Sequence, residues 1–151
     1  MTSETVKAKA SHRFAATPER VYDAWLDPAK LRVWMKAALQ EMGIAGDIRR
    51  LEVEARVGGK FFFSDMRDAG EARAWGVYRV LDRPRKIEFT WIVDESLENE
   101  VSVVTITIAP DGAGCVATIE HEIGAAWAAY VEKTEAGWSR MLRAIDAMLQ
   151  S

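Results

Sequence analysis

The last part of the chain, from Ala126 to Gln150, carries one continuous apolar stripe. The residues of the stripe recur at steps of three and four, which is the period of an α-helix with one buried face. They are Trp127, Tyr130, Val131, Thr134, Trp138, Met141, Leu142, Ile145, Met148 and Leu149. A helix of this length needs a large apolar surface to pack against. The sequence therefore predicts one long C-terminal helix that lies on a sheet.

The preceding residues supply that sheet as seven predicted strands. In the opening stretch Val6, Ala8, Ala10, His12 and Phe14 alternate with polar residues, which is the two-residue period of a half-buried strand. Six further strands are predicted over residues 48–56, 60–66, 73–82, 86–94, 101–109 and 115–123. Because short turns separate most of them, neighbouring strands should be antiparallel.

Two short helices should interrupt the sheet after the first strand. Thr17 followed by Pro18 combines a capping side chain with a proline that suits the first helical turn, and Asp27 followed by Pro28 repeats the pattern. Residues 37–46 mix apolar side chains with glycine, so they can extend the second helix or form a loop over a pocket mouth.

Composition limits the class and the compartment of the protein. A chain of 151 residues, 49% of them apolar, is expected to form one domain over residues 1–151. Cys115 is the one cysteine, so no intrachain disulfide can form, and a reducing cytoplasm is expected. No apolar run approaches the ~20 residues that span a bilayer. The 20 basic and 23 acidic residues are mixed along the chain, which argues against nucleic-acid binding.

Several segments resemble one protein family. They are ATPERVYDAW (16–25) continuing into Asp27-Pro28, VGGKF (57–61), IEFTW (87–91), EHE (120–122) and Gly137-Trp138. In this order the chain resembles the activator of heat-shock-protein ATPase homologue-like proteins, within the START-like, polyketide-cyclase-related superfamily. The chain departs from the family pattern after the second predicted helix, where family members often have two tryptophans followed by glycine and proline. It has Val33-Trp34-Met35-Lys36 there, which indicates a reshaped pocket rim.

The resemblance implies an α+β helix-grip fold, in which a seven-stranded antiparallel sheet curves around the long C-terminal helix. It also implies an internal cavity for a small apolar, aromatic or lipid-like ligand, so that the protein would act as a carrier or sensor. The alternatives are a polyketide-cyclase or dehydratase-like enzyme and a protein-binding module that contacts a chaperone ATPase. The family has no shared catalytic motif, so no cofactor is expected and catalysis is not favoured.

Candidate ligand-binding residues are the aromatic and polar side chains expected to point inward. They are Phe61, Phe63, Tyr78, Phe89, Trp91 and His121 on strands, and Trp127, Tyr130, Thr134 and Trp138 on the helix. The large aromatic residues can either fill the core or line the pocket. His121 shares its strand face with Ile119 and Ile123, so it points inward. It can meet the polar end of a ligand, act as a general acid or base, or be a hydrogen-bonded core histidine.

An enzyme would need converging acid and base groups, for which the candidates are His121, Tyr78 and either Asp65 or Arg67. No metal site is expected. Glu120 and Glu122 project to the face opposite His121, and nothing in the sequence places His12 near His121. Gly58-Gly59 lies between two strands, so it is expected to form a hairpin turn and not a phosphate cradle.

Gly137 lies inside the predicted C-terminal helix. A glycine in a helix interior costs about 1 kcal/mol relative to alanine, so close packing or a bend is expected to compensate. The N-terminal half of the helix should lie nearest the pocket mouth, and Leu142 to Leu149 should be ordinary core.

Overall fold

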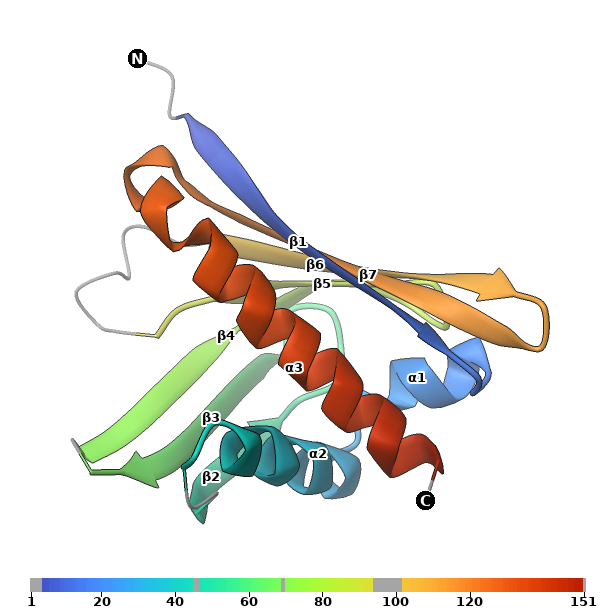
Figure 1. The fold of residues 1–151 in the computed structure, drawn as a ribbon, viewed down its shortest axis with the longest axis horizontal. Coiled ribbons are helices and arrows are strands. Elements are labelled where there is room, and N and C mark those ends of the chain that lie inside the picture. The colour runs from blue at the N-terminus through green and yellow to red at the C-terminus, as the bar shows by residue number, and fades with distance from the viewer. Residues whose placement is uncertain (1–3, 45–46, 69, 94–101, 151) are drawn as a thin grey trace.

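A curved antiparallel sheet and one long helix dominate the computed structural model, which describes residues 4–44, 47–68, 70–93 and 102–150 (Figure 1). The elements in chain order are β1 (Thr5–Phe14), α1 (Pro18–Ala24), α2 (Pro28–Glu41), β2 (Asp47–Val53), β3 (Lys60–Arg67), β4 (Gly70–Asp82), β5 (Lys86–Trp91), β6 (Ser102–Asp111), β7 (Gly114–Gly124), the 3-10 helix η2 (Ala125–Tyr130) and α3 (Val131–Gln150). This is the predicted α+β helix-grip arrangement.

The sheet has seven strands in the order β1-β7-β6-β5-β4-β3-β2. All neighbouring pairs are antiparallel, as predicted. β1 pairs with β7, far along the chain, with Thr5 opposite Gly124 and Phe14 opposite Cys115. Two strands end earlier than predicted, β2 at Val53 and β5 at Trp91. The predicted strand ends at residues 94 and 101 lie outside the described residues.

The first two helices begin with the predicted capping chemistry. The Arg20 backbone N–H donates to Thr17 Oγ1 (3.4 Å), and the Ala29 N–H donates to Asp27 Oδ1 (3.0 Å). The second helix is longer than the short helix expected, because α2 continues for 14 residues to Glu41. The helical interpretation of residues 37–46 therefore holds as far as Glu41, and residues 45–46 lie outside the described part of the chain.

The C-terminal helix differs from the prediction at its start. Residues Ala125–Tyr130 form the 3-10 helix η2, and the α-helix proper, α3, has 20 residues, or about five and a half turns. Trp127 and Tyr130 are 38% and 51% exposed, so the buried stripe does not include them. The 3-10 helix has three residues per turn, so its side chains do not continue the stripe of the α-helix. The buried face is formed by Trp138, Leu142, Ile145 and Leu149, which confirms the expectation that the C-terminal half of α3 is core.

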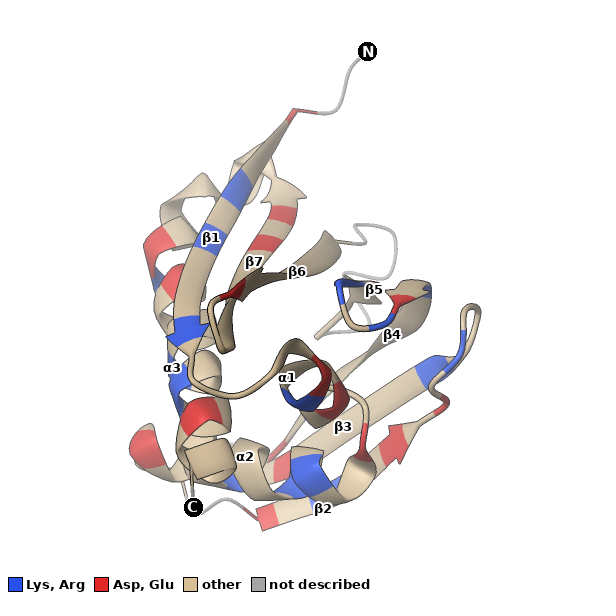
Figure 2. Cartoon of the chain, turned by 90° about the vertical axis from the view of Figure 1, so that its right-hand side faces the viewer, with Lys and Arg blue, Asp and Glu red and all other residues tan. Residues whose placement is uncertain are grey.

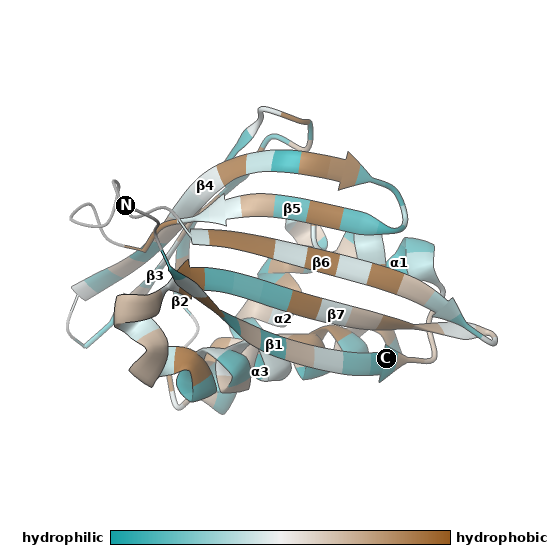
Figure 3. Cartoon of the chain, turned by 90° about the horizontal axis from the view of Figure 1, so that it is seen from above, coloured by the Kyte–Doolittle hydropathy of each residue, from teal (hydrophilic) through white to brown (hydrophobic). Residues whose placement is uncertain are grey.

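The core lies between the concave face of the sheet and the helices, which cover one side of it (Figures 1 and 3). Brown and pale bands alternate along β6 (Figure 3), where Val104, Ile106 and Ile108 are buried and Thr105 and Thr107 are not. Along α3, Leu142 and Ile145 are fully buried. Charged residues of both signs are spread over strands and helices (Figure 2). Within the described residues no helix is long and apolar enough to cross a membrane.

Candidate functional site

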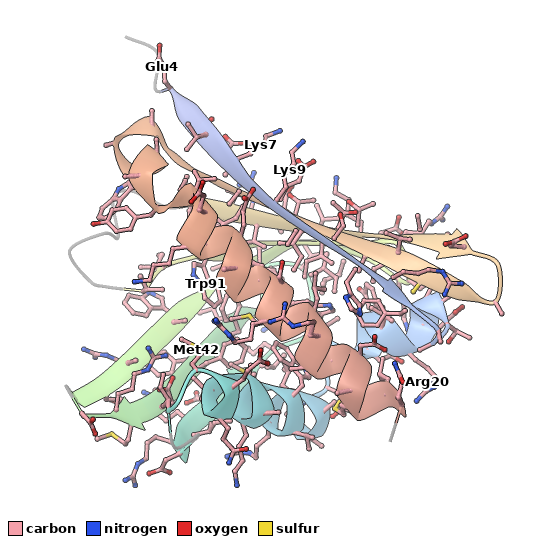
Figure 4. The ribbon with its side chains drawn as sticks, in the orientation of Figure 1. Glu4, Lys7, Lys9, Arg20, Met42 and Trp91 are labelled. Atoms are coloured by element: carbon pink, nitrogen blue, oxygen red, sulfur yellow. The ribbon has the colours of Figure 1, made fainter. Side chains whose placement is uncertain are left out.

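A cleft of about 460 Å³ lies between α2, α3 and strands β3 and β4. We call it the α2–α3 cleft. Its apolar lining includes Trp34, Met35, Leu39, Met42, Phe63, Trp75, Trp91, Val93 and Met141. Figure 4 shows Trp91 beside α3 and Met42 at the C-terminal end of α2. Small-molecule sites typically have volumes of about 300 to 1,000 Å³ and mostly apolar walls, so this cleft is large enough to hold a ligand.

A second cleft of about 660 Å³ lies near η2 and the start of α3, and we call it the η2 cleft. It is also lined by residues of β6 and β7. Trp91, Val93, Gly137 and Met141 line both clefts. The two clefts therefore meet under the middle of α3.

Tryptophan side chains connect the walls of the clefts to the core. Ring centroids lie 5.1 Å apart for Trp34 and Trp25, 6.3 Å for Trp25 and Trp138, and 5.4 Å for Trp138 and Trp91. Trp34 Nε1 also donates to the buried Ala24 carbonyl oxygen (2.8 Å). Because each ring packs on the next, we expect the aromatic wall to be held in place before a ligand binds.

Three of the aromatic residues predicted for the site belong to the core. Phe61, Tyr78 and Phe89 are almost fully buried, and the Phe61 ring packs on Tyr78 (5.3 Å) and Phe89 (5.4 Å). None of the three lines either cleft. Phe63 and Trp91 are only partly buried and line the α2–α3 cleft. Core filling and pocket lining are thus divided between neighbouring aromatic residues.

The remaining predicted residues lie together in the η2 cleft. Trp127, Tyr130, Thr134, Trp138 and His121 line it. The Trp127 and Tyr130 rings lie 5.5 Å apart, and Thr134 Oγ1 donates to the Tyr130 carbonyl oxygen (2.8 Å). None of these five residues lines the α2–α3 cleft, so the predicted set is split between two places.

His121 is 5% exposed and is hydrogen-bonded at both ring nitrogens. Trp138 Nε1 donates to His121 Nδ1 (3.1 Å), and an indole N–H can only donate, so Nδ1 carries no proton. His121 Nε2 then donates to Ser102 Oγ (2.8 Å), whose hydroxyl donates to the Trp91 carbonyl oxygen (2.8 Å). Burial lowers the pKa of His121 to about 4. The imidazole is therefore neutral near pH 7 and joins α3 to two strands.

The side chains considered for acid–base chemistry do not converge in the structure. His121 lies at the η2 cleft, whereas Asp65 and Arg67 line the α2–α3 cleft and bind each other (Arg67 Nε to Asp65 Oδ1, 2.7 Å). Tyr78 is in the core, where burial and the neighbouring Tyr22 raise its pKa. Asp65 and Arg67 thus share a cleft but bind each other, and neither His121 nor Tyr78 lines that cleft.

The two histidines have separate partners. His12 Nε2 on β1 lies 2.7 Å from Asp146 Oδ2 on α3, whereas His121 is bonded to Trp138 and Ser102. Across the β1–β7 pair His12 stands opposite Ala117. In the described ranges, no group of three or more histidine, cysteine, aspartate or glutamate side chains could hold a metal.

Sequence reasoning missed the charged residues of the α2–α3 cleft on β4 and α3. They are Glu71, Arg73 and Arg140. Arg140 could have been found, because Gly137, Arg140 and Met141 are three and four residues apart and so share one helix face. Glu71 and Arg73 carried no comparable signal, since both are exposed strand residues.

Of the two compensations expected at Gly137, close packing or a bend, close packing is wrong. Apart from its chain neighbours and the backbone of its own helix, no described atom lies within 4 Å of a Cβ placed on this glycine. Instead Gly137 lines both clefts at the point where they meet. A larger side chain here would enter the cleft space, so the glycine keeps that space open.

Comparison with known proteins agrees with this fold. A family model described as "Activator of Hsp90 ATPase homolog 1-like protein" matches residues 15–150. No curated protein matches the chain.

Among solved structures, protein CV1439 from Chromobacterium violaceum is 26% identical, with a TM-score of 0.77 over 96% of this chain and 97% of that one. Protein Ms6760 from Mycobacterium smegmatis is 21% identical, with a TM-score of 0.75 over 95% and 90% of the two chains. CalU16 from Micromonospora echinospora is 17% identical, with a TM-score of 0.66 over 96% and 84%. The last two likenesses concern the fold alone.

Proposed function

Because the chain belongs to the family of activator of Hsp90 ATPase homolog 1-like proteins, we propose that it binds a small apolar or aromatic molecule beneath α3. It would act as a carrier or sensor of that molecule. The α2–α3 cleft is the proposed binding site, and the meeting point with the η2 cleft gives a longer ligand room to extend.

The observation that carries this proposal is the open space at Gly137. A glycine in the interior of a helix lowers its stability by about 1 kcal/mol relative to alanine. At Gly137 no described neighbour comes close enough to require the missing Cβ. The cost therefore has no packing reason within the described protein, whereas a ligand in the cleft would supply one.

The walls of the cleft favour binding of an apolar body. Trp34, Phe63, Trp75 and Trp91 contribute ring surfaces, and Met35 and Met141 contribute flexible thioethers that adapt to irregular shapes. A ligand that buried about 200 Å² of apolar surface here would gain roughly 5 kcal/mol before the cost of association.

The enzyme alternative receives less support than binding. His121 is neutral and already bonded at both nitrogens, so its proton is engaged within the protein. Asp65 and Arg67 likewise bind each other. A general acid or base has to reach a substrate atom, and these three groups are directed to protein partners.

The proposal is tested by filling the space at Gly137. In Gly137→Leu the new side chain should occupy the cleft, while the helix should gain stability because leucine is a better helix former. Native mass spectrometry of protein purified from its natural host should detect a retained small molecule on the wild type and much less on Gly137→Leu.

The matched control is Ala136→Leu, because Ala136 is the preceding residue on the same helix and is exposed. This variant should retain the molecule as the wild type does. Equal retention by Gly137→Leu and Ala136→Leu, or a wild-type protein without any bound molecule, would count against the proposal.

A further inference from the structure

Arg140 is a cation of the α2–α3 cleft that has no ion-pair partner among the described residues. Its side chain lines the cleft from α3, and its Nε is buried and has no hydrogen-bond partner. In the part of the chain that the structure describes, no ion pair joins Arg140 to another residue. A buried donor of a charged group that stays unpaired is costly, so a partner from outside the protein would stabilise it.

The other charged residues of the cleft are occupied. Arg67 donates to both carboxylate oxygens of Asp65, at 2.7 and 3.3 Å. Glu71 accepts a hydrogen bond from the buried Ser64 hydroxyl (2.9 Å), and Arg73 also has an interaction of its own. Arg140 thus differs from its neighbours, because its buried Nε has no partner within the described ranges.

The charge of the cleft indicates how much negative charge a ligand would carry. Among the described lining residues, Arg67 pairs with Asp65 and Arg73 has an interaction of its own, so the positive charge left for a ligand is that of Arg140. A monoanion would neutralise it. A dianion such as a phosphate monoester would carry more negative charge than Arg140 neutralises, beside the carboxylates of Asp65 and Glu71.

The geometry of a guanidinium favours a carboxylate as that monoanion. The Nε–H and one Nη–H of an arginine point in parallel and match the two oxygens of a carboxylate. It is the Nε of Arg140 that is buried and unpaired. Gly137 and Met141 lie on the same helix face, and Trp91 completes the wall, so the rest of the ligand would be apolar.

We propose that the ligand of the α2–α3 cleft is an apolar or aromatic monocarboxylic acid whose carboxylate binds Arg140. This inference rests on the proposed function, since it names the chemical class of the molecule bound at the same site. The carboxylate would bridge Arg140 Nε and Nη, and the apolar body would lie against Trp91 and over Gly137.

A matched pair of probes tests the proposal. 2-Naphthylacetic acid and 2-naphthylacetamide share one ring system and differ in charge. Comparing their affinities by calorimetric titration therefore measures how much the carboxylate contributes to binding. The wild type should bind the acid about tenfold or more tightly than the amide. Arg140→Gln should lose this preference and bind the amide with nearly unchanged affinity.

Arg143→Gln is the matched control. Arg143 lies on the same helix and pairs with Glu41 at the surface (3.0 Å), outside both clefts. This variant should keep the preference for the acid. Circular dichroism melts of both variants establish whether they are folded. Equal wild-type affinity for acid and amide would overturn the inference even if Arg140→Gln fails to fold.

The outcomes separate this inference from the proposed function. Equal wild-type affinity for acid and amide, or a preference that persists in Arg140→Gln, overturns the inference and leaves the binding function standing. A neutral molecule retained by the wild type in native mass spectrometry would likewise overturn the inference and leave the binding function standing. If neither probe binds and no molecule is retained, both proposals fail.

Discussion

At the scale of single residues, His121 is a base that the interior keeps neutral. Its Nδ1 accepts from the Trp138 indole N–H and its Nε2 donates to Ser102, so a second proton would displace a donor. Burial disfavours the charged form as well and lowers the pKa of His121 to about 4. Replacing this ring with phenylalanine would leave the Trp138 N–H buried without its acceptor.

His121 should make the protein less stable as the pH falls from about 6.5 to about 4. In this window the unfolded chain binds a proton at His121, with an ordinary pKa near 6.5, whereas the folded chain does not. The unfolded state is therefore favoured as pH falls, by roughly 3 kcal/mol over the whole window, and the effect is absent above it.

Urea unfolding at several pH values measures this effect in the wild type and in His121→Gln. The stability difference between the two proteins should shrink as the pH falls, because only the wild type has the titrating ring. His12→Gln serves as the control and should keep the contribution of His121. A wild-type minus His121→Gln difference that does not change with pH would rule out a depressed pKa.

At the scale of elements, Gly76 in β4 and Gly137 in α3 differ in the space that surrounds the missing side chain. In β4, a Cβ on Gly76 would overlap the Thr90 carbonyl oxygen and lie 2.9 Å from the Phe61 ring, so the strand pairing needs glycine. In α3, a Cβ on Gly137 would meet no described atom within 4 Å other than its chain neighbours and the backbone of its own helix. The first glycine serves the packing of the sheet and the second keeps a cleft open.

Alanine at these two positions should therefore have effects of opposite sign. Gly137→Ala should raise the free energy of unfolding by up to about 1 kcal/mol, since it removes a glycine from a helix without a clash. Gly76→Ala should lower it by about 2 kcal/mol or more, because backbone has to move. Thermal and urea unfolding measure both, and a loss of stability in Gly137→Ala would mean that the space is filled in the folded protein.

At the scale of the whole molecule, one buried cluster connects the sheet with α3. Ile106 in β6 and Leu142 in α3 are both fully buried in it, together with residues of α1 and α2. We therefore propose that residues 1–151 form one domain that unfolds as a unit.

Substituting one buried side chain by alanine on each side of the core tests whether the sheet and α3 unfold together. Ile106→Ala and Leu142→Ala should each cost about 2 to 5 kcal/mol, the usual cost of removing a large buried aliphatic side chain. Far-UV circular dichroism and tryptophan fluorescence should report the same single transition in each variant. Separate transitions for the sheet and the helix would contradict the proposal.

The sequence by itself determined the elements and the fold class. Alternation placed β1 and its buried residues Ala8, Ala10 and Phe14, and capping residues placed the starts of α1 and α2. These signals act over a few residues, so they can be recognised in the sequence without knowing the rest of the protein. The inward direction of His121 followed from the same two-residue period.

Only the tertiary structure decided the site. It separated Phe61, which fills the core, from Phe63, which lines a cleft, although both lie on one strand with the same alternation. It brought Trp138 to His121 and left the buried Arg140 Nε without a hydrogen-bond partner in the part of the chain that the structure describes. These outcomes depend on how α3 crosses the curved sheet, because contacts between distant segments are set by packing geometry and not by local periodicity.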